Sequence, residues 1–134
     1  MKYFKFLIVL LFPLLMAASV KHSTVETKSR IMSDGTVLLQ FKTVANKGYK
    51  LKFNSEWNLN LKKYDNIVFD KVSFDQDNLK NDKKSNLFLI LLGKKTNMAT
   101  SGIVEYELTS YVCKTKNLCY KDIHKGYIPW KALK

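Results

Sequence analysis

The chain has few of the residues on which several classes of protein depend. Its 134 residues include two cysteines, two histidines, two prolines and five glycines, and 22 of its 23 basic residues are lysine. Structural zinc sites usually take four ligands, most of them cysteine or histidine, so this composition offers little for a zinc centre. We therefore expect no metal site and no cofactor.

The near absence of arginine bears on nucleic-acid binding. Arg30 alone offers the planar fork that recognises phosphates and bases in a bidentate way. Without residues 1–19, the chain has 21 basic and 11 acidic residues, a net charge of +10. Such a surface attracts anions of many kinds, but the lysines are dispersed along the chain. We expect no nucleic-acid partner and interpret the charge as a solvated surface in an anionic envelope.

Long apolar runs are also missing after the first twenty residues. Residues 1–19 have a basic start, a thirteen-residue apolar run at 6–18 and small residues at 17–19, which is the pattern of a secretory signal peptide. The run is short for a membrane span, which needs about 20 apolar residues. An uncleaved anchor is the alternative. We predict a periplasmic or otherwise exported protein whose mature domain, residues 20–134, has no stable membrane span.

Short alternating runs take the place of long helical periodicity. The segment Thr36–Ala45 alternates apolar and polar residues after a turn signal at 33–35, as in a half-buried strand. Further strand candidates lie at 49–53, 57–61, 67–74, 87–92, 103–113 and 126–130. Seven or eight such strands predict an all-β fold, an antiparallel β-sandwich in one domain. An immunoglobulin-like arrangement is attractive, although the cysteines are too close in sequence to bridge two sheets in the usual way.

Several segments carry more specific expectations. Residues 87–92 (LFLILL) are apolar at every position, which predicts a central, buried strand. Residues 75–86 are polar and charged, which predicts an exposed loop or a poorly ordered insertion. Pro129 indicates an edge strand or a strand end, because proline cannot donate to a sheet ladder. The aromatic residues that we expect in the core are Phe41, Phe53, Trp57, Phe69, Tyr106 and Tyr127.

Both cysteines lie in one short stretch, YVCKTKNLCYK, as Cys113 and Cys119. Five intervening residues fit a hairpin, in which opposed Cα atoms lie about 4.5–5.5 Å apart, within reach of a disulfide. In an exported protein two nearby thiols are expected to pair. A loop this short stabilises a fold by only about 2–2.5 kcal/mol, so stability alone is a weak reason for the pair.

Three uses of this pair are open: a structural staple, a metal site and a redox pair. Zinc is disfavoured because His124 is the only nearby histidine and Asp122 or a distant group would have to complete the site. Redox use has a physical basis, since cations stabilise the reactive thiolate and Lys114, Lys116 and Lys121 flank the cysteines. A staple is equally compatible with these lysines, because lysine is frequent throughout the chain.

The cysteine segment resembles that of the N-terminal periplasmic domain of the thiol:disulfide interchange protein DsbD. That family has two cysteines separated by five residues, with one aromatic residue shortly before the first and another directly after the second. It also has a Gly-Tyr step between two early strands. The resemblance covers residues 25–133, and the matching residues are Gly48, Tyr49, Tyr111, Cys113, Cys119 and Tyr120.

The resemblance implies an immunoglobulin-like sandwich in which Cys113 and Cys119 cycle between disulfide and dithiol. Cys119 would form the mixed disulfide with a partner, and Cys113 would resolve it. The chain departs from the family at Lys121-Asp122, where two prolines often stand, and in residues 75–86, which hold none of the aromatic side chains of the family's cap loop. Because the chain ends at position 134, the resemblance implies an electron donor on a separate polypeptide.

We therefore expect an exported thiol–disulfide exchange domain, a candidate oxidoreductase with Cys113 and Cys119 as its catalytic residues. Its partners would be a thioredoxin-like donor and other thiol proteins of the envelope, and we expect a monomer. The alternative is a binding module without enzymatic activity. In that case the same disulfide is only structural, and the basic surface or residues 75–86 carry the partner site.

Overall fold

The computed structural model describes residues 20–53, 55–81, 87–96 and 98–131. The predicted signal peptide at 1–19 lies outside the described residues. Among the residues described, no helix is long and apolar enough to cross a membrane. The elements are β1 (Ser23–Ile31), β2 (Thr36–Ala45), β3 (Lys50–Leu51), β4 (Asn58–Tyr64), β5 (Ile67–Phe69), β6 (Ser73–Asp75), the 3-10 turn η1 (Gln76–Asn78), β7 (Lys80–Asn81), β8 (Leu87–Lys95), β9 (Ser101–Thr115) and β10 (Leu118–Lys131).

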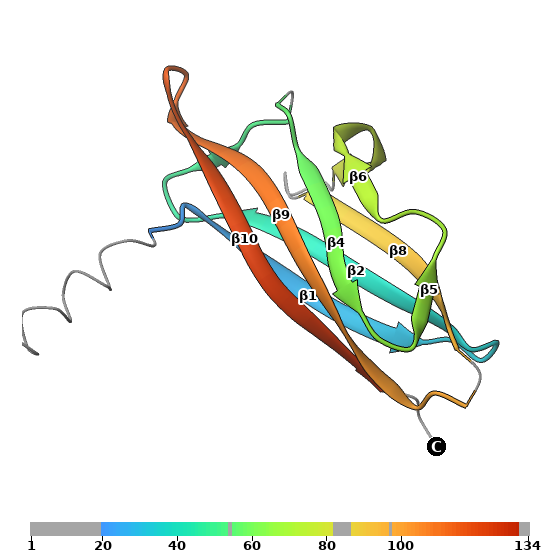
Figure 1. Ribbon diagram of the computed structural model, residues 1–134. Coiled ribbons are helices and arrows are strands. Elements are labelled where there is room, and N and C mark those ends of the chain that lie inside the picture. Colours follow the sequence, from blue (N-terminus) through green and yellow to red (C-terminus); the bar gives the residue numbers. More distant parts are fainter. Residues whose placement is uncertain (1–19, 54, 82–86, 97, 132–134) are drawn as a thin grey trace, which may run out of the picture.

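The strands form two antiparallel sheets that pack face to face (Figure 1). One sheet has the order β1-β2-β8-β5, with β7 also paired to β8, and the other has the order β10-β9-β4-β6, with β3 also paired to β9. If β1, β2, β4, β5, β8, β9 and β10 are counted as seven successive strands, this is the strand order of an immunoglobulin-type sandwich. The predicted all-β sandwich is confirmed.

Alternation of inward and outward residues along the strands creates the core between the sheets. In β2, Val37, Leu39 and Phe41 point inward and are buried, while the residues between them are partly exposed. The same period of two applies to β4 and, apart from the buried Thr109, to β9, because successive side chains of a strand face opposite sides. The buried apolar residues on these and the remaining strands are Leu51, Trp57, Leu59, Leu61, Ile67, Leu89, Leu91, Val104, Tyr106, Leu108, Val112, Ile128 and Trp130.

β8 differs from its prediction as a strand buried on both faces. It lies between β2 and β5, so its central position is confirmed. Leu89 and Leu91 are 4% exposed, but Ile90 and Leu92 are 56% and 59% exposed. Antiparallel sandwiches cover only one face of each sheet, and in the described residues no element packs on the outer face of this one.

Two of the aromatic residues predicted for the core lie outside it. Tyr127 is 67% exposed because it occupies an outward position of β10, and Phe53 is 39% exposed because β3 ends two residues before it. Phe41, Trp57 and Tyr106 are buried as predicted. Phe69 is partly buried against them.

The stretch 67–74, predicted as one strand, is divided between the sheets. β5 pairs with β8, and β6 pairs with β4 of the opposite sheet. The predicted loop at 75–86 then contains η1, where the side chains of Asp75 and Asn78 form a capping box, followed by β7. Its residues 82–86 lie outside the described residues. Pro129 lies on β10, which is an edge strand as predicted.

Candidate functional site

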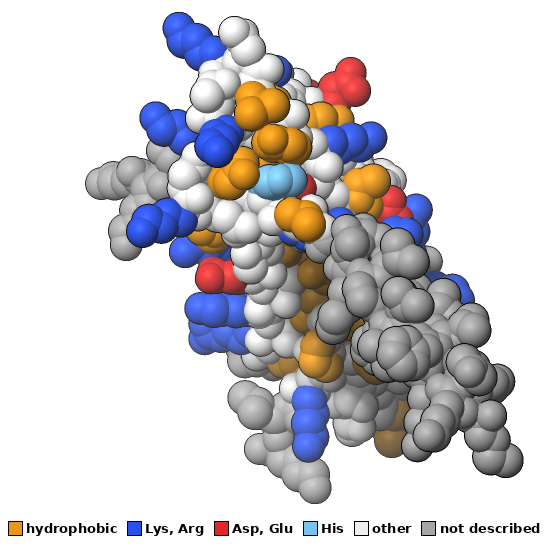
Figure 2. Space-filling model, turned by 90° about the vertical axis from the view of Figure 1, so that its left-hand side faces the viewer, with side chains coloured by type: hydrophobic (Ala, Val, Ile, Leu, Met, Phe, Trp, Pro, Cys, Tyr) orange, Lys and Arg blue, Asp and Glu red, His pale blue; other side chains and the backbone are white. Residues whose placement is uncertain are grey.

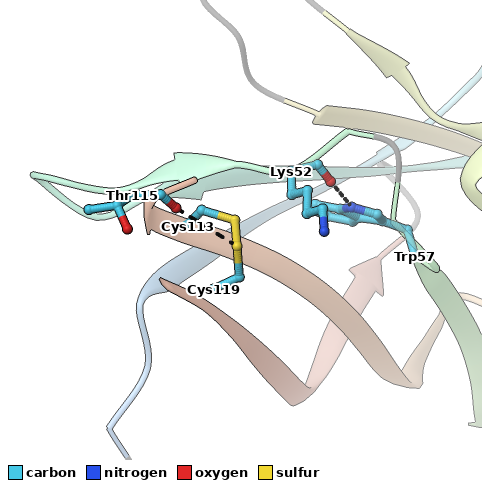
Figure 3. Close-up of a disulfide and its surroundings, with 5 residues drawn as sticks. All are labelled: Lys52, Trp57, Cys113, Thr115 and Cys119. Atoms are coloured by element: carbon cyan, nitrogen blue, oxygen red, sulfur yellow. Dashed lines mark hydrogen bonds between the residues drawn. A yellow bond between two sulfur atoms is a disulfide. The ribbon is translucent and has the colours of Figure 1, made fainter. Parts of the chain in front are cut away.

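Cys113 and Cys119 form a disulfide near the tip of the β9–β10 hairpin (Figure 3). A two-residue turn closes this hairpin and pairs Thr115 with Leu118. A regular continuation of that register would place Lys114 opposite Cys119. A β-bulge shifts the register by one residue, so Cys113 is opposite Cys119 and their Cα atoms lie 3.9 Å apart. Bulges often re-aim side chains beside active sites, and this one is what brings the two sulfurs together.

The disulfide lies on the outer face of its sheet, away from the core. Along β10, Asp122, Ile128 and Trp130 point inward and are buried, whereas Cys119 has the opposite parity and is exposed. Cys113 is half-buried, with β3 on its other side. Cys119 is therefore the sulfur that a thiolate arriving from solvent reaches more easily.

The sulfur of Cys119 also lies near the backbone of the turn. Its Sγ atom is 4.0 Å from the carbonyl oxygen of Thr115 (Figure 3). A disulfide sulfur carries no hydrogen, so this contact can become a weak hydrogen bond only after reduction to the thiol.

Lysines surround the disulfide on its own face of the sheet. Lys50 of β3 is opposite Cys113, and Lys121 follows Cys119 at the next outward position of β10. The backbone N–H of Lys52 donates to the carbonyl oxygen of Tyr111 at 2.9 Å, which fixes this segment beside β9. Within 46–53 and 109–121, which are all described, six lysines are exposed and the sequence has no aspartate or glutamate. They are Lys47, Lys50, Lys52, Lys114, Lys116 and Lys121.

The inner face of the same hairpin carries an aromatic group. The rings of Tyr120 and His22 are stacked, with centroids 3.9 Å apart and planes at 13°. The ring of Tyr49 meets both, at 5.0 Å from His22 and 6.0 Å from Tyr120. On the face drawn in Figure 2, a histidine lies among hydrophobic side chains, with lysines around them. This group joins the segment before β1, the turn before β3 and the start of β10.

A buried polar network lies next to the aromatic group. Asp122 is 2% exposed, and its Oδ2 atom accepts hydrogen bonds from the hydroxyl of Ser23 at 2.5 Å and from the backbone N–H of His22 at 2.8 Å. Its Oδ1 atom lies 3.3 Å from Nδ1 of His22. The Ser23 oxygen also lies 2.8 Å from Nε2 of His124 and 3.0 Å from the hydroxyl of Ser110. Since its one hydrogen is given to Asp122, Ser23 accepts from both of these groups.

This arrangement of Ser, His and Asp differs from a hydrolase triad. In a triad the aspartate orients the histidine, which takes the serine proton. Here the carboxylate of Asp122 binds Ser23 directly, and Ser23 is 3% exposed. The network therefore connects the start of β1 to β9 and β10 by hydrogen bonds, and its role is structural.

The network shifts the pKa values of two of its groups. Burial by itself would raise the pKa of Asp122, but the hydrogen bonds from Ser23 and His22, together with the nearby His124, hold that pKa below its usual value of 3.8. Burial lowers the pKa of His124 below 6.5; the carboxylate of Asp122 opposes this shift, and Lys21 adds to it. The folded protein thus favours an ionised Asp122 beside a neutral His124.

The residues that are close to the cysteines in sequence lie on two different faces of the sheet. Tyr111 and Lys121 are opposite each other on the outer face, beside the disulfide. Asp122 and His124, considered above as further metal ligands, are directed into the buried network. In the part of the chain that the structure describes, no group of three or more His, Cys, Asp or Glu side chains is arranged to hold a metal ion.

Sequence reasoning missed the contribution of the N-terminal segment to this end of the molecule. His22 and Ser23 contact residues about a hundred positions further along the chain. A signal was present in β9, where Ser110 occupies an inward position among apolar residues, and in β10, where Asp122 does the same. A polar residue at a buried strand position requires a hydrogen-bond partner.

No protein-family model matches the chain, and no curated protein matches it either. Function must therefore be inferred from the site. The arrangement offers an exposed disulfide, one sulfur more accessible than the other, and a surface of positive charge around both.

Proposed function

We propose that this chain is a thiol–disulfide exchange domain of an exported compartment, with Cys113 and Cys119 as its redox pair. The observation that carries the proposal is the position of the disulfide. It lies on the solvent face of a hairpin whose strands already pair at fourteen positions. A cross-link placed there adds little to a hairpin that the sheet and the core already fix.

The exchange chemistry follows from the difference in accessibility between the two sulfurs. A thiolate of a reduced partner attacks Sγ of Cys119, the Cys113–Cys119 bond breaks, and Cys113 leaves as a thiolate that takes a proton from solvent. The second thiol of the partner then loses its proton and attacks the partner's own sulfur in the mixed disulfide. This step releases Cys119 as a thiolate and leaves the partner oxidised. Two electrons have then passed from the partner to the pair.

The reverse sequence passes these electrons on. The thiolate of Cys119 attacks the disulfide of an oxidised envelope protein, and Cys113 resolves the mixed disulfide. The exposed lysines around the pair favour the thiolate form of either cysteine. The resemblance of the cysteine segment to the DsbD N-terminal domain supports the same roles and would make a thioredoxin-like protein the donor.

Electron transfer from reduced thioredoxin, used as a probe, tests the proposal. The oxidised protein is mixed with the probe, quenched with acid and treated with a thiol-alkylating reagent, and the alkylated forms are separated by mass. We expect two new thiols in this protein for each molecule of thioredoxin that is oxidised. Binding of the probe without any transfer would favour the binding module with a structural disulfide.

A trapping experiment tests the assignment of the two cysteines. Thioredoxin that lacks its resolving cysteine forms a stable mixed disulfide, whose position peptide mass spectrometry can determine. We expect attachment at Cys119, because Cys113 is half-buried. Attachment at Cys113 would contradict the assignment, and the variant with both cysteines replaced by serine is the control that gives no adduct.

A further inference from the structure

The outer face beside the disulfide carries charge of one sign. Cys113 and Cys119 are bordered by Lys50 on β3 and by Lys121 on β10, and Lys52 follows Lys50 at the next outward position. None of these three lysines forms an ion pair with a described residue. An approaching thiol partner therefore meets uncompensated positive charge at the reacting sulfurs.

The middle of the same face has lysines opposite glutamates. Four residue pairs further along the hairpin from Lys121–Tyr111, Lys125 is directly opposite Glu107. On the neighbouring strand, Lys63 is opposite Glu105. Opposite charges at facing positions of a sheet compensate each other. The longest group of lysines without a facing carboxylate thus lies at the disulfide end of this face, while Lys131, opposite Ser101, is a single lysine at the other end.

We propose that Lys50, Lys52, Tyr111 and Lys121 form a docking surface that selects thiol partners whose reactive cysteine is flanked by acidic side chains. The proposal rests on the proposed function, since the partner is the molecule that exchanges with Cys119. Tyr111 is half-buried between the lysines and offers an aromatic surface to the partner's backbone next to its cysteine. The lysines supply the charge that an acidic segment complements.

The physical effect on the reaction is electrostatic steering. The attacking species is a thiolate, so a positive surface raises its local concentration, and acidic neighbours strengthen this attraction. A partner whose cysteine lies between basic residues is repelled by the same lysines. The discrimination must weaken with added salt, because the Debye length falls from about 30 Å at 0.01 M to about 3 Å at 1 M ionic strength.

Two matched peptides, Asp-Cys-Asp and Lys-Cys-Lys, provide the test. Each is mixed with the oxidised protein, and the rate of disulfide reduction is measured and divided by the thiolate concentration of that peptide. We expect Asp-Cys-Asp to react at least about tenfold faster at low ionic strength, since three nearby charges act on it. The ratio is expected to fall to a few-fold or less near 1 M salt.

Variants show whether the named lysines cause the preference. Lys50→Glu combined with Lys121→Glu is expected to abolish or invert the ratio of the two rates. Lys28→Glu combined with Lys94→Glu, exposed changes on β1 and β8 of the other sheet, is the matched control, because it changes the net charge by the same amount, and it is expected to leave the ratio unchanged. Both changes concern exposed side chains, and circular dichroism checks that the fold is kept.

The outcomes separate this proposal from the proposed function. Equal rates for the two peptides, including no detectable reaction with either, or a preference that survives the double variant, would overturn the docking surface. A preference for the acidic peptide combined with no electron transfer from thioredoxin would keep the docking surface and reject the relay.

Discussion

The two faces of the β9–β10 hairpin differ in what they contribute to the molecule. On the outer face, Cys119 and Lys121 are exposed, next to the half-buried Cys113. On the inner face, Tyr120 stacks on His22, and Asp122 is buried in a hydrogen-bonded network. Residues that are neighbours in sequence thus alternate between the solvent-exposed outer face and the inner face with its stabilising contacts, because successive side chains of a strand point to opposite sides.

This difference indicates where the hairpin gets its stability. The inner face joins β10 to the segment before β1 and to β9 through His22, Ser23 and Ser110. None of these contacts involves either sulfur. We therefore expect the disulfide on the outer face to be reducible without loss of the fold, which the proposed redox role requires.

Replacing Asp122 with alanine should have the largest effect on stability. The change removes the acceptor of Ser23 and His22 and leaves buried donors unpaired, so we expect a loss of about 3 kcal/mol in the free energy of unfolding. Urea denaturation of the oxidised protein measures it. The neighbouring outward change Lys121→Ala is the control, with an expected effect within about 0.5 kcal/mol. Equal losses for the two variants would refute the division between the faces.

Removing the disulfide should have a smaller effect. The variant with Cys113→Ser and Cys119→Ser is expected to stay folded and to lose no more than about 2.5 kcal/mol, because the closed loop is short. Circular dichroism and urea denaturation, compared with the oxidised protein, give both quantities. An unfolded double variant would show that the cross-link is a structural staple, and the comparison of the faces would then fail.

The aromatic group on the inner face should contribute less to stability than the disulfide does. Tyr120→Leu removes the ring that stacks on His22 and is expected to cost about 1 kcal/mol. Tyr111→Leu, the matched change on the outer face, should cost less, because among the described residues no aromatic ring stacks on Tyr111. If thermal denaturation gave the reverse order, the outer face would carry the structural contacts.

The pH dependence of stability should be the smallest of these effects. The folded-state pKa of His124 lies below 6.5, so on acidification the unfolded chain binds a proton first and stability falls as the pH drops through about 6.5. The stabilisation from Asp122 is present above pH 3.8 and is lost at lower pH, as its carboxylate is protonated. One group contributes at most about 1.4 kcal/mol per pH unit. His124→Gln should remove the first step, and an unchanged profile in that variant would contradict this origin.

Much of the fold could be predicted from the sequence because alternation determines which side of a strand is buried. The bounds of β2 and the inward positions of β4 and β9 follow directly from this pattern. The pattern failed at β8, because the apolar character of a residue does not show whether its position faces the core or the solvent. It also failed at 67–74, where two short strands join different sheets without any break in the run of residues.

The candidate site was predictable only in part. The spacing of Cys113 and Cys119 indicated a hairpin disulfide, but it did not indicate the bulge that makes them opposite. The buried network joins Ser23 to Ser110 and Asp122, which are 87 and 99 positions away. Such contacts depend on how the edges of the two sheets meet, and no local pattern encodes that geometry.

The most direct test of the redox role is the midpoint potential of the Cys113–Cys119 pair. The protein is equilibrated in thiol–disulfide buffers of known potential, its free thiols are trapped, and the fraction of reduced protein is measured by mass. We expect half-reduction at a potential above about −300 mV, within the range of exchange domains. A pair that stays oxidised below about −300 mV would behave as a structural disulfide and would contradict the redox role.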